Sequence, residues 1–293
     1  MSLIEKAVER LDGLRRDPAK NGSVAPQWEP SVNAVGGGGE MRSEGDRKGV
    51  PSGQYVELDL GRLQAAGFIV PGVSASLIAE EFRVLKRPLL ANVSGSAAPI
   101  RNANLIMVTS SLPGEGKSFS AINLAISIAM ELDRTVLLVD ADVARPSLPR
   151  ELGLPEQKGL LDVLQDETLK LSDVLLRTNI DKLTILTAGT HDPHATELLA
   201  SETMGRLLDE IARRYSDRIV IFDSPPLLVT TESRALAARM GQIVFVVRAE
   251  ETSQQAVKDA LGTIESCPVK LLVLNQARNV ENVAYGYEYG YGY

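Results

Sequence analysis

A glycine-rich segment that ends in lysine and serine is the feature of this sequence best suited to chemistry. It reads Ser111-Leu-Pro-Gly-Glu-Gly-Lys-Ser118 and follows an apolar run at 105–110. Glycines let successive backbone N–H groups converge on phosphate oxygens, and a helix beginning at Ser118 adds positive potential there. In this pattern Lys117 reaches the β- and γ-phosphates, and the Ser118 hydroxyl is a ligand for Mg²⁺.

The segment therefore predicts a P-loop that binds ATP together with Mg²⁺. Ser111 stands where the usual pattern begins with glycine, which is a departure from it. The residues expected to contact the nucleotide here are Pro113, Gly114, Glu115, Gly116, Lys117, Ser118 and Phe119.

Two acidic motifs follow apolar runs farther along the chain. Asp140-Ala-Asp142 ends the run 135–140, and Asp223 ends the run 218–223. In a parallel sheet the ends of these runs lie at the edge that also holds the P-loop. A lone carboxylate after a strand is often only a turn-former, but two of them in this order favour a metal site. We expect Ser118, Asp142 and Asp223 to organise Mg²⁺.

The elements that must position these residues are visible as alternating apolar and helical stretches. The strand candidates are 105–110, 135–140, 183–188, 218–223, 242–247 and 270–275. Near-continuous apolar runs of this kind suit strands buried on both faces of a parallel sheet. Helix-length segments lie between them at 118–132, 195–214 and 253–265. The alternation predicts a doubly wound, mostly parallel α/β sheet.

The rest of the chain differs in composition. Apolar residues at helical spacing over 1–16 predict an amphipathic N-terminal helix, which binds a partner or simply caps the fold. Residues 17–54 include Gly36–Gly39 and few apolar residues, so they predict a flexible, disordered linker. The domain is expected at 55–278, and a C-terminal tail at 279–293.

The composition and the net charge argue against several classes of protein. The formal net charge of -7 argues against broad nucleic-acid binding, which depends on Lys and Arg. Cys267 is the only cysteine in the 293 residues, so an intrachain disulfide is excluded. The first residues lack the apolar core of a signal peptide, and no run approaches the roughly 20 apolar residues of a membrane span. We therefore expect a cytoplasmic protein.

Five of the seven tyrosines lie in the last nine residues. They alternate mainly with glycine, which weakens any strand or helix, so the hydroxyls are expected to be exposed. A low-complexity end or an adhesive aromatic segment is the alternative to a phosphoacceptor role. The candidate phosphoacceptors are Tyr285, Tyr287, Tyr289, Tyr291 and Tyr293.

Together these motifs resemble the bacterial tyrosine kinase family. The resemblance is carried by the P-loop, by Val136-Leu-Leu-Val-Asp-Ala-Asp142 and by Phe222-Asp-Ser-Pro-Pro226, and it covers about 79–293. The whole chain is most similar to the tyrosine autokinases of exopolysaccharide loci associated with PEP-CTERM sorting. This implies the deviant Walker type of P-loop fold, shared with ATPases that partition plasmids or position the division site.

The resemblance also implies an activity and roles for residues. It implies an ATP- and Mg²⁺-dependent protein-tyrosine autokinase that phosphorylates its own C-terminal tyrosines in exopolysaccharide biosynthesis or export. Lys117, Asp140 and Asp142 would be catalytic, with Asp140 receiving the tyrosyl proton. Asn275 matches a residue near the adenine, although a polar strand end is an equally fair interpretation.

The resemblance further implies partners. Glu80, Arg83 and Lys86 are similar to the family's oligomerisation motif on one helical face, with Lys86 in place of its final arginine. A plain solvated helix face is the alternative. The expected partners are further copies of this chain in a ring, a separate inner-membrane polysaccharide chain-length protein that activates it, and a cognate tyrosine phosphatase. The protein would then be peripheral at the inner membrane.

Two other functions compete with this hypothesis. An ATPase switch of the plasmid-partitioning kind would carry a further lysine early in the P-loop, where Leu112 and Pro113 stand. A non-catalytic scaffold would bind nucleotide without phosphorylating anything, and intact Lys117, Ser118, Asp140 and Asp223 argue against it.

Overall fold

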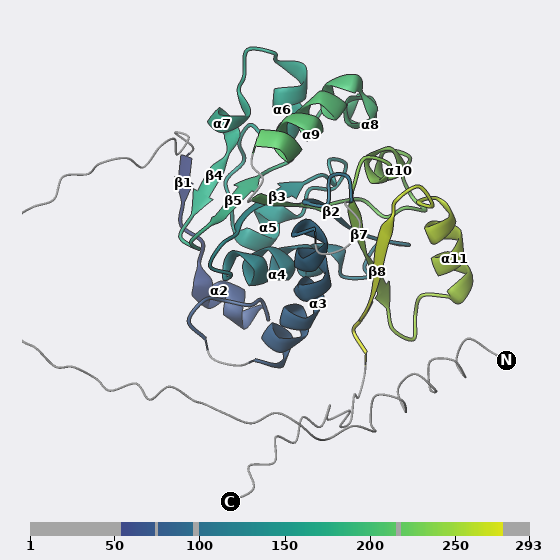
Figure 1. Cartoon of the computed structure of the whole chain (residues 1–293). Helices are drawn as coiled ribbons and strands as arrows, with labels where there is room; N and C mark the ends of the chain where they lie inside the picture. Colours follow the sequence, from purple (N-terminus) through teal and green to yellow (C-terminus); the bar gives the residue numbers. More distant parts are fainter. Residues whose placement is uncertain (1–53, 74–75, 96–99, 215–217, 278–293) are drawn as a thin grey trace, which may run out of the picture. The chain divides into compact units, whose positions relative to one another are not determined.

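The computed structural model describes residues 54–73, 76–95, 100–214 and 218–277 (Figure 1). Within these residues the strands form one eight-stranded sheet. Its strands are β1 (Gln54–Val56), β2 (Leu105–Ser110), β3 (Thr135–Asp140), β4 (Leu176–Thr178), β5 (Leu183–Leu186), β6 (Arg218–Asp223), β7 (Gln242–Arg248) and β8 (Val269–Asn275). Their order across the sheet is β1-β4-β5-β3-β6-β2-β7-β8.

Helices pack on both faces of the sheet. They are α2 (Leu60–Ala65), α3 (Leu77–Val93), α4 (Lys117–Ala129), α5 (Leu148–Leu152), α6 (Leu160–Gln165), α7 (Leu171–Val174), α8 (Ala195–Ala200), α9 (Glu202–Arg214), α10 (Glu232–Ala237) and α11 (Gln254–Gly262). Helices α2, α3 and α4 share a core with one face of the sheet, and α6, α8, α9 and α10 share a core with the other. This is the doubly wound α/β fold that the sequence predicted.

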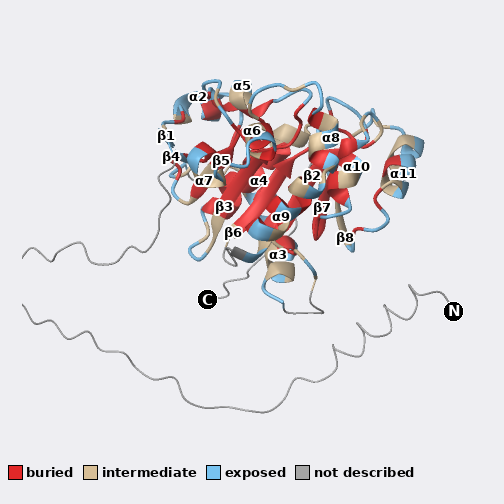
Figure 2. Ribbon diagram, turned by 90° about the horizontal axis from the view of Figure 1, so that it is seen from above, coloured by how far each residue is buried: buried red, intermediate tan, exposed pale blue. Residues whose placement is uncertain are grey.

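The central strands are buried on both faces, as Figure 2 shows in red. Alternate residues of a strand point to opposite faces, so Leu105 and Met107 belong to one core while Ile106 and Val108 belong to the other. Strands β5, β3, β6, β2, β7 and β8 are mutually parallel. Their carboxyl ends therefore meet at one edge of the sheet.

Helix α4 begins directly at the P-loop and runs through the centre of one layer. From Ser120 to Ala129 every residue of this helix is buried, because α3 covers its outer side (Figure 1). Lys86 of α3 makes a further link: its ammonium lies 2.7 Å from Glu131 and donates to the Ser127 carbonyl at 2.5 Å. The helix that carries the phosphate-binding loop is thus held firmly from outside.

The charged motif on α3 differs from the expectation of one solvated face. Glu80 and Arg83 are half-exposed and form an ion pair with each other. Lys86 is only 5% exposed and points inward to α4. Its charge is thus paired within the single chain. An interface role for Glu80, Arg83 and Lys86 stays a prediction.

Other expected elements differ in detail. The segment 195–214 is two helices rather than one, because Ser201 is extended and its hydroxyl accepts from the Met204 amide at 3.1 Å, which starts α9 afresh. The strand expected at 183–188 ends at Leu186. At the β1 edge, β4 pairs antiparallel with β5, so the sheet is mostly but not entirely parallel.

Several predicted segments lie outside the described residues. These are the N-terminal helix at 1–16, nearly all of the linker at 17–54 and the tyrosine tail at 279–293. The domain boundaries therefore stay predictions. Among the described helices, not one has both the length and the apolar character needed to cross a bilayer.

Candidate active site

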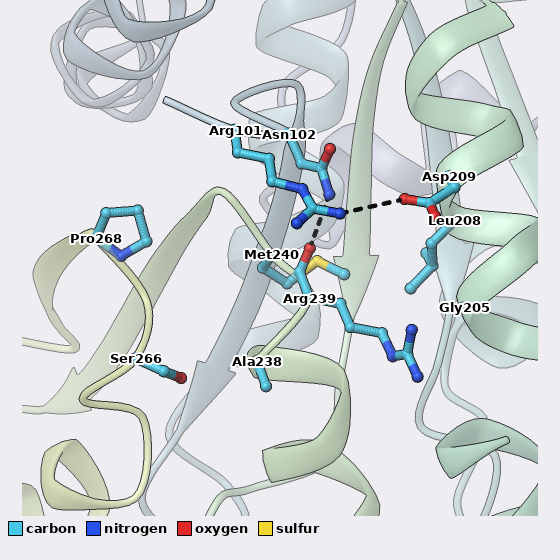
Figure 3. Close-up of a pocket in the computed structure, with 10 residues that line it drawn as sticks. All are labelled: Arg101, Asn102, Gly205, Leu208, Asp209, Ala238, Arg239, Met240, Ser266 and Pro268. Carbon is cyan, nitrogen blue, oxygen red and sulfur yellow. Dashed lines mark hydrogen bonds and ion pairs between the residues drawn. The ribbon is translucent and has the colours of Figure 1, made fainter. Parts of the chain in front are cut away.

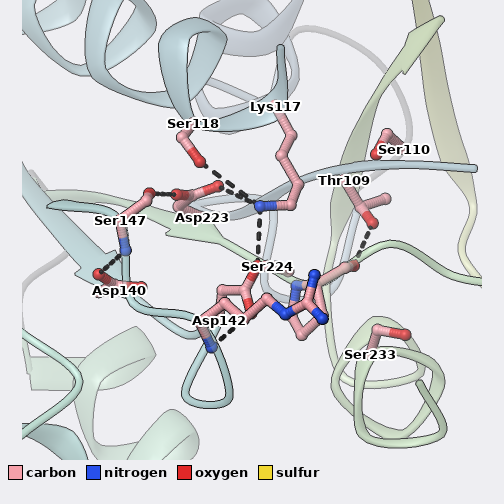
Figure 4. A network of polar contacts seen from close by, with 12 residues as sticks. Thr109, Ser110, Lys117, Ser118, Asp140, Asp142, Ser147, Asp223, Ser224 and Ser233 are labelled. Carbon is pink, nitrogen blue, oxygen red and sulfur yellow. Dashed lines mark hydrogen bonds and ion pairs between the residues drawn. The ribbon is translucent and has the colours of Figure 1, made fainter. Parts of the chain in front are cut away.

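Three parallel strands deliver the predicted site residues to one edge of the sheet. β2 leads into the P-loop, while β3 and β6 end at Asp140 and Asp223, which are paired in register. Figure 4 shows Lys117, Ser118 and the aspartates converging there. The structure thus brings together residues that lie more than a hundred positions apart in the sequence, and their individual roles remain predictions.

Lys117 is the centre of this group. Its ammonium lies 2.8 Å from Asp142 Oδ2 and 4.0 Å from Asp223 Oδ1, and it donates to the Ser118 hydroxyl at 3.5 Å (Figure 4). Burial by itself lowers the pKa of Lys117, but the charges of Asp223 and Asp142 outweigh it and raise the pKa above its usual value. The lysine is therefore a fixed positive charge at the strand ends.

Asp140 and Asp223 are fully buried carboxyl groups. Asp140 Oδ2 accepts from the Ser147 and Leu148 amides at 3.1 and 3.0 Å. Burial, followed by the charge of Asp223, raises the pKa of Asp140 to about 8. Burial also raises the pKa of Asp223, against the opposing effect of Lys117. A carboxyl group with a pKa near neutrality is suited to exchanging a proton with a substrate.

The Asp223 carboxylate fits a magnesium ion. Its Oδ1 is buried and has no hydrogen-bond partner within the described residues. Oxygen atoms of this kind are the ligands that Mg²⁺ prefers, and the Ser118 hydroxyl lies beside them. No ready-made cage of three or more His, Cys, Asp or Glu side chains occurs in the described part of the chain. Mg²⁺ does not need one, since it usually keeps water and substrate phosphate as ligands.

The P-loop is shaped by two glycines and closed by the last strand. Gly114 and Gly116 both have positive φ values, of 85° and 92°. A Cβ atom at Gly116 would lie only 2.0 Å from the side chain of Asn275. That side chain donates to the Glu115 carbonyl at 2.9 Å. Glycine is therefore required at 116, and Asn275 supports the P-loop directly, whether or not it also lies near the base.

Two residues expected to contact nucleotide have side chains turned elsewhere. The Glu115 carboxylate is buried, accepts from the Leu112 amide at 2.6 Å and bonds the Thr252 hydroxyl. The Phe119 ring packs on Phe68, with 5.1 Å between ring centres. A contact of either residue with nucleotide stays a prediction. Their side chains instead fix the loop to its surroundings.

Sequence reasoning missed Ser147 and Thr252. The Ser147 hydroxyl donates to Asp223 Oδ2 at 2.9 Å while its amide donates to Asp140, so this residue bridges the ends of β3 and β6. Thr252 holds Glu115 from the loop after β7. Both are polar residues in loops without a characteristic spacing, so no local pattern distinguished them from ordinary turn residues.

Comparison with known proteins finds a matching family and several relatives. Residues 103–276 match the family described as AAA domain. Tyrosine-protein kinase YwqD of Bacillus subtilis is 31% identical over 214 residues, which is 72% of this chain and 86% of that protein. Succinoglycan biosynthesis transport protein ExoP of Rhizobium meliloti is 34% identical over 66% of this chain but only 24% of its own length.

Solved structures agree in fold. The crystal structure of the chimerical protein CapA2B2 has a TM-score of 0.58 with 26% identity, and the match covers 75% of this chain and 92% of that one.

Proposed function

Because this chain belongs to the bacterial tyrosine kinase family and is a protein-tyrosine kinase, we propose that it transfers phosphate from ATP to its own C-terminal tyrosines. The observation that carries this proposal is the position of Lys117 between Asp142 and Asp223, with the buried Asp140 paired in register with Asp223. A cation for phosphate and a proton acceptor for a hydroxyl thus stand at one sheet edge. Kinases of this family transfer phosphate to tyrosine, and this sequence has five tyrosines within 285–293.

The reaction follows from these groups. The tyrosine oxygen forms a bond to the γ-phosphorus as the bond from that phosphorus to the bridging oxygen of ADP breaks. The phenolic proton passes to the carboxylate of Asp140, which ends β3 at the same sheet edge. Lys117 and the P-loop amides hold the phosphate oxygens, where charge spreads during the transfer.

The remaining polar groups keep this arrangement in place. Ser147 fixes Asp140 and Asp223 relative to each other through its amide and its hydroxyl. Ser118, Asp142 and Asp223 would hold Mg²⁺, which neutralises phosphate charge when bound. Asp142 also orients Lys117 through their 2.8 Å ion pair. The protein thus contributes mainly positioning and electrostatic stabilisation.

We also propose a role in exopolysaccharide biosynthesis, with an activator on a separate inner-membrane chain. The name of ExoP places that relative in succinoglycan biosynthesis, and this chain matches only 24% of it. YwqD, by contrast, is matched over 86% of its length. Regions similar to this chain therefore occur both within longer proteins and as most of a shorter kinase. A peripheral location at the inner membrane, a ring of several copies and a cognate phosphatase complete the proposal.

The first prediction concerns Lys117. Lys117→Met should abolish tail phosphorylation, because it removes the charge that faces the transferred phosphate while keeping the length of the side chain. Intact mass after incubation with Mg·ATP is the measurement, and each transferred phosphate adds about 80 Da. Lys258→Met is the matched control, since Lys258 is exposed on α11 and distant from the strand ends.

A variant truncated before Tyr285 locates the acceptors. Mass gained by the parent and by Lys258→Met, but by neither of the other two, supports the proposal. The incubation is repeated with detergent-solubilised inner membranes to supply the activator. ATP hydrolysis that survives truncation, with no phosphotyrosine in any sample with or without those membranes, would contradict it and favour the ATPase switch.

A further inference from the structure

Strand β8 forms an open edge of the sheet. It is the last strand in the order, and all seven of its residues are paired with β7 on one side. Among the described residues no strand pairs with its other side. In a strand that is paired on one side only, about half of the backbone N–H and C=O groups point outward without a partner strand. β8 therefore presents a template to which a further strand can be added.

The residues that usually protect an edge strand are scarce in β8. Proline prevents pairing because it has no N–H, but Pro268 precedes the strand and lines a cavity of about 370 Å³ at its amino end (Figure 3). Lys270 is the one charged residue of β8, and its ammonium donates back to the Cys267 carbonyl at 2.6 Å. From Leu271 to Leu274 the strand is wholly apolar. An apolar edge of this kind invites pairing with another segment unless something covers it.

Two leucines extend this edge into an exposed apolar surface. Leu272 and Leu274 are 56% and 65% exposed, and they lie on the same face of the strand. Leu272 is paired in register with Phe245 of β7, which is fully buried in the core that α11 also joins. Leu271 and Val273 point to the opposite face and pack against the other core. The apolar face beneath α11 therefore continues at β8 beyond the residues that cover it.

The chain leads directly from this edge into a segment with matching spacing. β8 ends at Asn275, the described residues end at 277, and five tyrosines follow at 285–293. Gln276 has a φ of 57°, so the backbone leaves the extended conformation immediately after the strand. Residues 276–284 separate β8 from Tyr285, which exceeds the length of about two to five residues of a usual hairpin loop. The tyrosines are therefore near enough in the chain to return along β8.

We propose that the C-terminal segment of this chain adds a strand to the open edge of β8, with its tyrosine rings packed on Leu272 and Leu274. Alternate residues of a strand lie on one face about 7 Å apart, so tyrosines at every second position match leucines at every second position. The residues between the tyrosines are glycine or glutamate. Glycine weakens a strand on its own, so the segment needs β8 as its template and the contact is reversible. This docking requires no phosphate transfer and goes beyond the proposed function.

Phosphorylation would release the docked segment. A tyrosine ring that packs on the leucines keeps its hydroxyl toward water, because the ring is apolar and the hydroxyl is polar. Phosphate on that hydroxyl adds about −1.5 to −2 charges, and such a charge is unfavourable beside apolar side chains. A tyrosine that lies along β8 is also withheld from a kinase site. The edge would therefore hold the unmodified segment and release the phosphorylated one.

The test measures hydrogen exchange of β8 in the full chain, freed of ATP and treated with a phosphatase. Peptides that cover 269–275 report the uptake of deuterium by mass. We expect roughly half of these amide groups to exchange about tenfold more slowly than in a variant truncated before Tyr285. The difference should persist on about a hundredfold dilution, because the docked segment belongs to the same chain.

Variants of the chain assign the protection to particular side chains. Serine at all five tail tyrosines should remove it, whereas phenylalanine should keep it, since the ring rather than the hydroxyl makes the contact. Leu272→Ser combined with Leu274→Ser should abolish the difference between the full and truncated chains. The matched control Leu132→Ser, at an 85% exposed position after α4, should leave that difference unchanged. The tail variants decide the matter if the double variant fails to fold, because they leave β8 itself intact.

The outcomes separate this inference from the proposed function. Protection of β8 that depends on the tyrosine rings, in a chain that transfers no phosphate with or without the solubilised membranes, would support the docking and overturn the function. Phosphate transfer to the tail, with β8 exchanging equally fast in the full and truncated chains, would overturn the docking and leave the function standing. Protection that disappears on dilution would also overturn the docking, because a second copy would then cover the edge.

Discussion

At the scale of single residues, Asp162 joins the loop before α6 to the loop after β5. Its Oδ2 accepts from the Gly159 amide at 2.8 Å and from the Thr190 amide at 2.9 Å. Gly159 also lies so close to the Thr187 carbonyl that a Cβ atom there would lie 2.2 Å from it. Burial alone would raise the pKa of Asp162, but the backbone donors outweigh it and hold the pKa below its usual value.

This carboxylate gives a pH-dependent prediction. A lowered pKa contributes stability above the ordinary value of about 3.9, and that stability is lost as the pH falls through the lower pKa of the folded chain. Asp162→Ala should reduce the free energy of unfolding by about 1–2 kcal/mol at pH 7. The difference from the parent should shrink below about pH 4.

Urea unfolding at pH 7 and pH 3 measures both values, with the exposed Asp133→Ala as the control for losing a surface carboxylate. A loss of equal size at both pH values would show that the carboxylate charge is not what holds the two loops.

The site residues differ in whether a short sequence pattern is enough to predict them. Lys117 and Ser118 belong to one short pattern, and Asp140 and Asp223 end apolar runs, so the sequence places all four at one sheet edge. Ser147 was not predictable, because its contact with Asp223 joins residues 76 positions apart. The orientation of the Glu115 side chain was equally hidden, since it depends on a partner 137 positions away. Contacts of this kind are products of the packed fold.

At the scale of secondary structure, Lys86 and Glu131 join α3 to the end of α4. The Lys86 side chain is 6% exposed and that of Glu131 is 29% exposed. The hydrogen bond from Lys86 leads the interactions that lower the pKa of Glu131. Because Lys86 also donates to the Ser127 carbonyl, it satisfies the last turn of the P-loop helix.

The unequal burial of this pair predicts unequal effects of mutation. Glu131→Gln leaves an ammonium group buried without its counter-charge and should cost about 2 kcal/mol of unfolding free energy. Lys86→Met keeps most of the side-chain volume and leaves only a partly exposed carboxylate, so it should cost less than about 1 kcal/mol. Urea unfolding of the two single variants gives the comparison. Equal losses, or a greater loss in Lys86→Met, would contradict this account.

Elements were predictable where the local pattern was strong. Strands β2, β3 and β6 coincide with the expected apolar runs, because burial on both faces requires uninterrupted apolar residues. The three-residue strand β1 forms one edge of the sheet and the equally short β4 lies next to it, and neither has such a run. The break between α8 and α9 depends on the Ser201 side chain bonding its own backbone neighbourhood, which helical periodicity does not reveal.

At the scale of the whole molecule, charge links the proposed activity to assembly. The chain already has a formal net charge of -7. Each phosphotyrosine adds about −1.5 to −2, so five would add roughly −8 to −10. Glu80, Arg83 and Lys86 of α3 are the candidate contact between copies, and the first two form an exposed ion pair. Contacts of exposed charges are weak individually and sensitive to added repulsion.

The last prediction follows from the negative charge that phosphorylation adds. Incubation with Mg·ATP should shift the protein from a larger assembly toward smaller species, because about doubling the net charge raises repulsion between copies. Sedimentation velocity at low salt measures the shift, and intact mass on the same samples counts the phosphates. A variant with phenylalanine at all five tail tyrosines should stay assembled under the same conditions. The Arg83→Glu variant should sediment as the smaller species even before Mg·ATP is added. Full phosphorylation without any change in sedimentation would contradict this prediction, because it would show that phosphorylation of the tail does not control assembly.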